Sequence, residues 1–70
     1  MTVVTVGGTL EDIEAATGFM IEFESGQRQY VGTLSEKIVF PMCDRFDEEG
    51  KTVAHARLCI KNGEHYTVLA

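Results

Sequence analysis

Four side chains, those of Cys43, His55, Cys59 and His65, belong to the types that bind transition metals. Structural zinc sites bring their ligands as close pairs, such as two cysteines separated by two residues. The nearest pair here is His55 and Cys59, and on one extended strand these two residues lie about 13 Å apart. His65 is expected on the opposite face of the same hairpin. We therefore predict no metal site and no bound cofactor.

The same residues are poorly spaced for nucleophilic catalysis. A thiolate nucleophile needs a base within hydrogen-bond reach, and the one histidine that a neighbouring strand could bring near Cys43 is His55. The chain also lacks a Gly-x-Ser-x-Gly turn and a paired-carboxylate cleft. Its acidic segment 44–49 lacks the alternating ligands of a calcium loop. We expect no catalytic residue and no enzyme, and we expect free thiols rather than a Cys43–Cys59 bridge.

The distribution of charge disfavours binding to nucleic acids. The chain has 6 basic and 11 acidic residues and a formal net charge of -5. Residues 1–26 contain no lysine or arginine, and no basic cluster follows that could attract a phosphate backbone. Gly7-Gly8 stands where a phosphate-binding loop would have glycines, but Glu11 and Asp12 would repel an anion there. The two glycines are expected only to permit a tight corner.

Length and hydropathy limit the class of protein further. A helix that spans a membrane needs about 20 consecutive apolar residues, and the chain contains no such stretch. The N-terminus lacks the basic start and apolar core of a signal peptide. We expect a cytoplasmic location. A chain of 70 residues forms one domain, residues 1–70. A core of this size rarely supplies more than about 3–5 kcal/mol, so self-association would add stability that the core lacks.

The first third of the chain predicts a strand, a helix and a second strand. Thr2–Val6 is β-branched throughout and is typical of a strand. Thr9 is a helix cap with Asp12 as its capping-box partner, and Gly18 is expected to end this helix in a left-handed conformation. In residues 19–24, Phe19, Ile21 and Phe23 then share one face and both glutamates lie on the other, as in a half-buried strand.

The middle third predicts a returning strand and an edge strand. Ser25-Gly26 forms a turn, and residues 27–34 return antiparallel. With a two-residue loop, Tyr30 lies opposite Ile21, and Gln29 lies opposite Glu22. Residues 37–43 are an apolar run in which Pro41 cannot donate to a ladder, so this strand is expected at an edge or with a bulge. Residues 47–50 are expected to form a turn.

Asn62-Gly63 is the strongest hairpin signal in the sequence. A two-residue loop pairs Lys61 with Glu64, and this register then pairs Ile60 with His65 and Cys59 with Tyr66. One face of the hairpin is apolar and is expected to join the core. Its residues are Ala54, Ala56, Leu58, Ile60 and Leu69.

The other face of this hairpin mixes polar and apolar side chains and is the candidate interaction surface. It consists of Val53, His55, Arg57, Tyr66 and Val68, together with Cys59. Tyrosine and arginine are enriched where proteins meet, because they combine a large contact area with a polar group. A loop or the segment 37–43 folding over this face is the alternative explanation.

These elements predict an α+β fold, with one short helix packed on a twisted, mainly antiparallel meander of five to six strands. Our first functional hypothesis is a non-enzymatic protein-interaction module, homodimeric, that docks on another protein. A second is an acidic decoy, of the kind that phages and mobile elements make, that occupies a basic nucleic-acid-binding groove on its target. Its acidic face would consist of Glu11, Asp12, Glu14, Glu22 and Glu24. A third is a small-molecule-binding subunit with its site at an oligomer interface.

Overall fold

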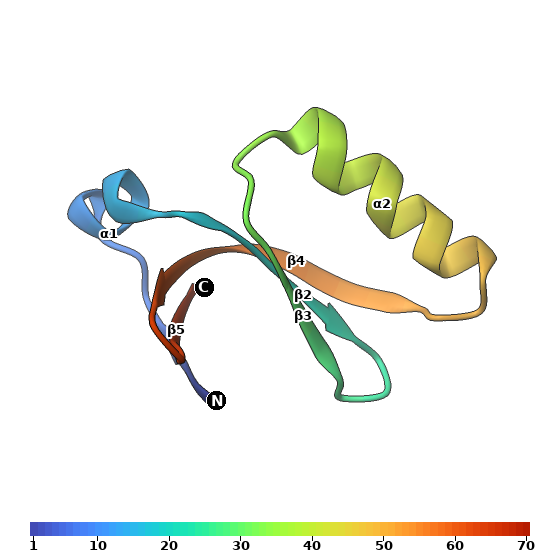
Figure 1. The fold of residues 1–70 in the computed structure, drawn as a ribbon, viewed down its shortest axis with the longest axis horizontal. Coiled ribbons are helices and arrows are strands. Elements are labelled where there is room, and N and C mark those ends of the chain that lie inside the picture. The colour runs from blue at the N-terminus through green and yellow to red at the C-terminus, as the bar shows by residue number, and fades with distance from the viewer.

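The computed structural model describes residues 1–70 and contains one five-stranded sheet and two helices (Figure 1). In chain order the elements are β1 (Thr2–Val6), α1 (Leu10–Ala15), β2 (Gly18–Phe23), β3 (Arg28–Val31), α2 (Glu36–Glu48), β4 (Val53–Asn62) and β5 (His65–Leu69). The strand order is β1-β5-β4-β2-β3. The β1–β5 pair is parallel, and the other pairs are antiparallel. The α+β prediction with a mainly antiparallel sheet is confirmed.

The sheet curls so strongly that one of its faces closes around a small core. Met20, Cys59 and Val68 are fully buried in this core, and Val3, Tyr30 and Tyr66 pack against them. These side chains come from all five strands. The ring centroids of Tyr30 and Tyr66 are 5.3 Å apart although β3 and β5 are not neighbours in the sheet. We call this side the concave face.

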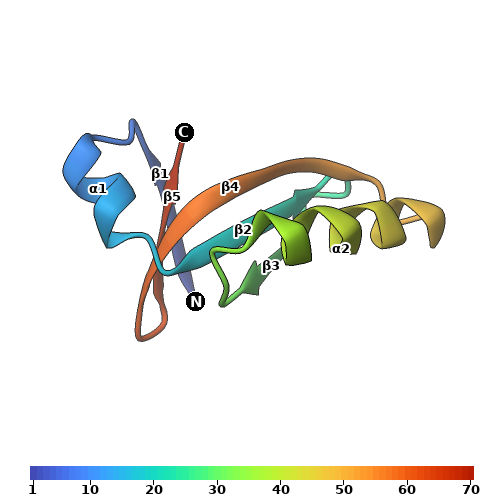
Figure 2. The same ribbon diagram turned by 90° about the horizontal axis from the view of Figure 1, so that it is seen from above.

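The two helices lie on the other face of the sheet. Figure 2 shows α1 beside the β1–β5 end, on the side turned away from β3, and α2 beside the β2–β3–β4 end. Val39 of α2 is fully buried, and the ring of Phe46 contacts Phe23 of β2 edge to face at 5.2 Å. Phe19 and Ile21, which share this face of β2 with Phe23, are buried as well.

The capping of α1 is as predicted at its start and different at its end. The backbone N–H of Asp12 donates to Thr9 Oγ1, and the N–H of Thr9 donates to the Asp12 carboxylate, each at 3.2 Å. This reciprocal pair is a capping box. The prediction that Gly18 ends the helix is wrong, because the helix ends at Ala15 and Gly18 has no positive φ.

Gly18 is instead required by the close packing of β2 against β3. A Cβ atom at this position would overlap the Val31 carbonyl oxygen and would lie 2.9 Å from the Tyr30 hydroxyl. The neighbouring Thr17 fixes this contact. Its hydroxyl lies 2.8 Å from the Tyr30 hydroxyl, accepts from the Lys61 N–H at 2.9 Å and donates to the Cys59 carbonyl at 3.3 Å. One hydroxyl therefore ties β3 to β4.

The prediction of an edge strand at residues 37–43 is wrong, since this segment is the first half of α2. Val39, Cys43 and Phe46 recur at helical spacing and form the buried and half-buried stripe that faces the sheet. Pro41 falls on the exposed side.

The helix continues through residues that were expected to form a turn. After Glu48 it ends in a Schellman motif, in which the Lys51 N–H donates to the Phe46 carbonyl and the Gly50 N–H to the Asp47 carbonyl. Gly50 has a φ of 86°, which this motif requires.

Both hairpin registers differ from the predicted ones. Between β2 and β3, Met20 lies opposite Tyr30 and Ile21 opposite Gln29, because the loop has one residue more and Gly26 adopts a φ of 90°. Between β4 and β5, Asn62 lies opposite His65. The turn there is Gly63-Glu64 with positive φ at Gly63 alone, since Asn62 does not adopt the left-handed conformation that the predicted turn needs.

Replacing Gly18 with alanine should destabilise the fold by about 1–3 kcal/mol, because the new methyl group overlaps backbone that cannot move independently. Urea unfolding followed by circular dichroism measures the change. Gly7→Ala is the matched control, since nothing lies within 4 Å of a Cβ atom there, and it should leave stability unchanged or slightly raised. Equal stability of the two variants would contradict the role given to Gly18.

Candidate functional site

The predicted interaction face does not form one exposed surface. Val68 is fully buried in the concave core, so the prediction that it projects outward is wrong. A register shift in β4 brings Val53 opposite Phe23, on the helix-covered side, and separates it from His55. Tyr66 is half-buried against the core, whereas His55 is exposed. Apart from Val53, the residues of the predicted interaction face do lie on one side of β4 and β5. The curl of the sheet turns this side inward, so that it becomes the concave face.

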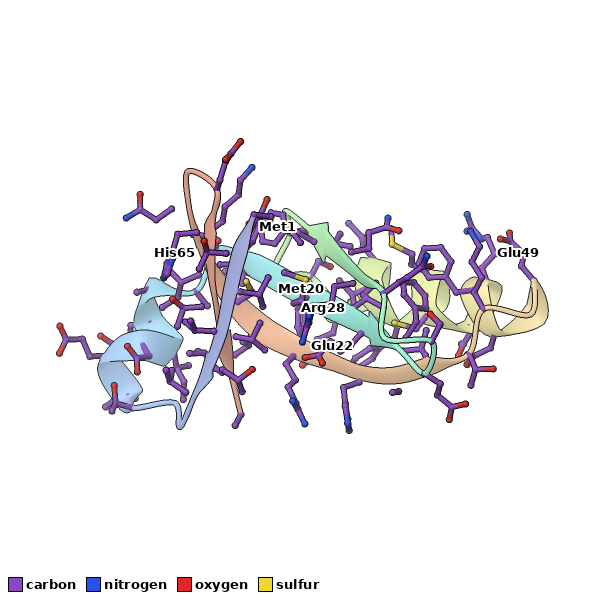
Figure 3. All side chains as sticks on the ribbon, turned by 90° about the horizontal axis from the view of Figure 1, so that it is seen from below. Met1, Met20, Glu22, Arg28, Glu49 and His65 are labelled. Atoms are coloured by element: carbon purple, nitrogen blue, oxygen red, sulfur yellow. The ribbon has the colours of Figure 1, made fainter.

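Arg57 of the predicted face is engaged within the chain. Its Nη1 lies 3.7 Å from Glu22 Oε1, and Arg28 Nε lies 3.9 Å from Glu22 Oε2. Figure 3 shows Glu22 and Arg28 next to Met20 on the concave side. Glu22 Oε1 is buried and accepts no hydrogen bond, so the two guanidinium groups balance its charge. This cluster continues the concave core with charged groups rather than forming an open site.

The five residues of the predicted acidic face do not lie together. Glu11, Asp12 and Glu14 belong to the short helix α1, at one end of the molecule. Glu24 lies in the β2–β3 turn, beside the other end of the sheet, and Glu22 is on the concave face. Asp12 also uses its carboxylate to cap α1. A single acidic surface, which the decoy hypothesis requires, is therefore not present.

The molecule has one hollow, of about 270 Å³, between the β2–β3 turn and the α2–β4 loop. Phe23 is its one hydrophobic residue, and the rest of its wall is polar or glycine. The other wall residues are Glu24, Ser25, Gln27, Gly50, Lys51 and Thr52. Ligand sites are mostly apolar and enclosed, so this open polar hollow is a poor candidate. No three His, Cys, Asp or Glu side chains are grouped as metal ligands.

The two cysteines are unpaired and lie in different layers of the structure. Cys59 is buried in the concave core, and burial raises the pKa of its thiol. Cys43 is half-buried on α2. Burial, followed by the carboxylates of Asp47 and Asp44, raises the pKa of the Cys43 thiol. A raised pKa keeps both groups protonated at neutral pH, which is the reverse of what a nucleophilic cysteine needs.

Exposed large apolar side chains gather in two segments of the chain. One segment is residues 1–13, with Met1, Val4, Val6, Leu10 and Ile13, and the other is residues 34–40, with Leu34, Ile38 and Phe40. Figures 1 and 2 place β1 and α1 at one end of the molecule and α2 at the other. Isolated exposed apolar residues are ordinary, but their concentration in two segments marks candidate contact surfaces.

We call Leu34, Ile38 and Phe40 the α2 surface. Their exposed fractions are 52%, 53% and 51%. In a helix, Ile38 and Phe40 lie about 100° on either side of Val39, which points into the sheet. Ile38 and Phe40 therefore lie on opposite flanks of the stripe that faces the sheet, and the apolar arc of the first turns of α2 is wider than the sheet can cover. Sequence analysis missed this surface because residues 37–43 were read as a strand, although an apolar arc this wide would have been visible on a helical projection.

The second half of α2 has a different character. Asp44, Asp47 and Glu48, followed by Glu49, are exposed, and Arg45 is the one basic residue of the last turn. An exposed apolar surface is thus followed along the same helix by a row of carboxylates.

Neither helix of the molecule is long and apolar enough to cross a membrane.

Alkaline pH should destabilise the protein through its thiols. Because their folded pKa values are raised above the ordinary 9.0, the thiols ionise first in the unfolded chain. Their contribution to stability is complete below pH 9 and is lost as the pH rises through the folded pKa values. Urea unfolding across this range should show a steeper loss for the wild type than for Cys59→Ala. Parallel curves would contradict a raised pKa for Cys59.

No protein-family model, no curated protein and no solved structure matches this chain. Its function is therefore inferred from the chemistry of its own surfaces. Of these, the concave face is filled by side chains of the chain itself, whereas the α2 surface and the β1–α1 end remain exposed.

Proposed function

We propose that this chain is a non-enzymatic protein-interaction module that docks on another protein through the α2 surface. The observation that supports this most directly is the half exposure of Leu34, Ile38 and Phe40, just before and at the start of α2. This helix already packs on the sheet through a different stripe of side chains, which consists of Val39, Cys43 and Phe46. The sheet needs that stripe for its own stability. The remaining apolar side chains of the helix are available to a partner.

Covering this surface would release a useful amount of free energy. Complete burial of one large apolar side chain contributes about 1.5–3 kcal/mol, and half of each of the three side chains remains to be buried. Ile38 and Phe40 are carried by a 13-residue helix that ends in a Schellman motif, and Leu34 directly precedes the N-cap Ser35, so little ordering is needed on binding. A preorganised helix pays a smaller entropy cost than a segment that folds on its partner.

The charges on α2 indicate the chemistry of the partner. The acidic residues Asp44, Asp47 and Glu48 follow the apolar surface along the helix. Phe40 lies on the same flank of α2 as Asp44 and Asp47. A fitting partner therefore presents an apolar groove to the Phe40 flank of the first turns and lysine or arginine side chains beside the second half of the helix. Screening by salt should weaken this electrostatic part of the binding and leave the apolar part intact.

Two unpaired thiols fit a reducing compartment such as the cytoplasm.

The decoy alternative requires a single acidic face, and its five residues do not form one. Glu22 is paired with two arginines, and Glu24 lies far along the sheet from α1. The small-molecule alternative has only the open polar hollow beside Phe23.

Charge placed on the α2 surface should remove partner binding without unfolding the chain. Tagged wild-type protein and Phe40→Glu are compared by pull-down from the native host, with mass spectrometry to identify the partner. We expect Phe40→Glu to weaken binding of the identified partner at least about tenfold. Leu10→Glu is the matched control, because Leu10 is 72% exposed but lies on α1, and it should bind like the wild type.

Two results would contradict docking through the α2 surface. One is a partner that binds Phe40→Glu as tightly as wild type, and the other is equal loss of binding in Leu10→Glu. Thermal unfolding of each variant must match that of the wild type, so that lost binding reports on the surface.

A further inference from the structure

The outer edge of β1 carries backbone groups that have no partner in the chain. The Thr2 N–H donates to the Glu64 carbonyl at 2.9 Å, and the Val6 carbonyl accepts from the Ala70 N–H at 2.8 Å. Alternate residues of a strand direct their N–H and C=O groups to the same side. Thr2, Val4 and Val6 therefore bond to β5, and the N–H and C=O groups of Val3 and Thr5 point to the open edge.

This edge lacks the features that keep strands from pairing with other molecules. Charged side chains, proline, bulges and short length protect natural edge strands. The segment 2–6 has five residues with no charge, proline or bulge. The opposite edge of the same sheet, β3, has four residues and begins with Arg28. The chain thus protects one edge of its sheet and leaves the other open.

The charge of the chain favours a second copy at this edge over any other place of self-contact. Each copy has a net charge of -5, so two copies repel wherever their acidic residues meet. Residues 1–10 form the longest segment without a charged side chain. Val4 and Val6 are 39% and 37% exposed, and because the preceding Val3 packs against the concave core, they lie on the opposite face of β1. Leu10 of the neighbouring helix α1 is also exposed.

We propose that β1 pairs antiparallel with β1 of a second copy, so that one continuous sheet runs through a symmetric dimer. A pairing centred on Val4 overlaps the whole strand Thr2–Val6 of both copies. It places Val3 of each copy opposite Thr5 of the other, where their outward N–H and C=O groups bond reciprocally. Val4 then lies opposite its own copy on the dimer axis.

This dimer extends the proposed interaction module and can be tested apart from it. Pairing through β1 leaves α2 exposed on each copy, at the far end of the molecule (Figure 1). A homodimer would therefore present the α2 surface twice and would bind a repeated or dimeric partner with increased avidity. Self-association through backbone and apolar contacts should strengthen as salt screens the repulsion between two acidic copies, whereas docking by α2 should weaken.

The test is sedimentation velocity over a concentration series for wild type, Val4→Glu, Val4→Lys and an equimolar mixture of the two variants. The wild type should dimerise. Each single variant should dimerise at least about tenfold more weakly, because two like charges meet on the axis. The mixture should form a heterodimer, since the charges are then opposite. A heterodimer also shows that both variants are folded.

A second pair of variants tests the backbone contacts. Thr5→Pro removes an N–H that points to the open edge and should abolish dimerisation, whereas Thr5→Ala keeps the N–H and should dimerise like the wild type. A wild type that remains monomeric at every concentration overturns the proposal. So does a Val4→Glu variant that dimerises normally, or a mixture that forms no heterodimer. Binding of the α2 partner by Val4→Glu distinguishes failure of this dimer from failure of the proposed function.

Discussion

The structure depends on the close approach of β2, β3 and β4 around Gly18. Because this residue has no side chain, the Val31 carbonyl and the Tyr30 hydroxyl can reach the backbone of β2. Thr17 then bonds to Tyr30 and to the backbone of β4 through one hydroxyl group. This contact holds β3 against the bent sheet, so that its tyrosine reaches Tyr66 of β5. These contacts join β3, β4 and β5 across the curled sheet.

The curl decides which surfaces are free to act. It directs Met20, Cys59 and Val68 into the concave core, which therefore cannot serve as a binding face. Only 9 of the 70 residues are buried, so the core is small, and a core of this size rarely supplies more than about 3–5 kcal/mol of net stability. Apolar side chains that find no place in it remain on α2 and around β1. Covering these surfaces by protein contacts would add free energy comparable to that of the core.

Local signals in the sequence predicted local structure well and long-range packing poorly. The β-branched run of β1 and the Thr9–Asp12 capping box depend on neighbouring residues and were confirmed. The segment 37–43 was misassigned because an apolar run with Pro41 fits a strand when the helical stripe that continues to Phe46 is ignored. The hairpin registers depend on which residue of each turn adopts a positive φ, and in both turns this residue is a glycine, Gly26 or Gly63. The predicted interaction face failed because alternation along a strand does not reveal the curl of the sheet.

The most direct measurement is amide hydrogen exchange at residue resolution, followed by NMR from dilute to concentrated protein. The concave face is filled by side chains of the chain itself, and the outer edge of β1 has backbone groups without partners. The amides of Val3 and Thr5 should gain protection as the concentration rises, while those of Thr2 and the β3 edge should not change. Protection that is independent of concentration, or that appears at β3 instead, would contradict this account.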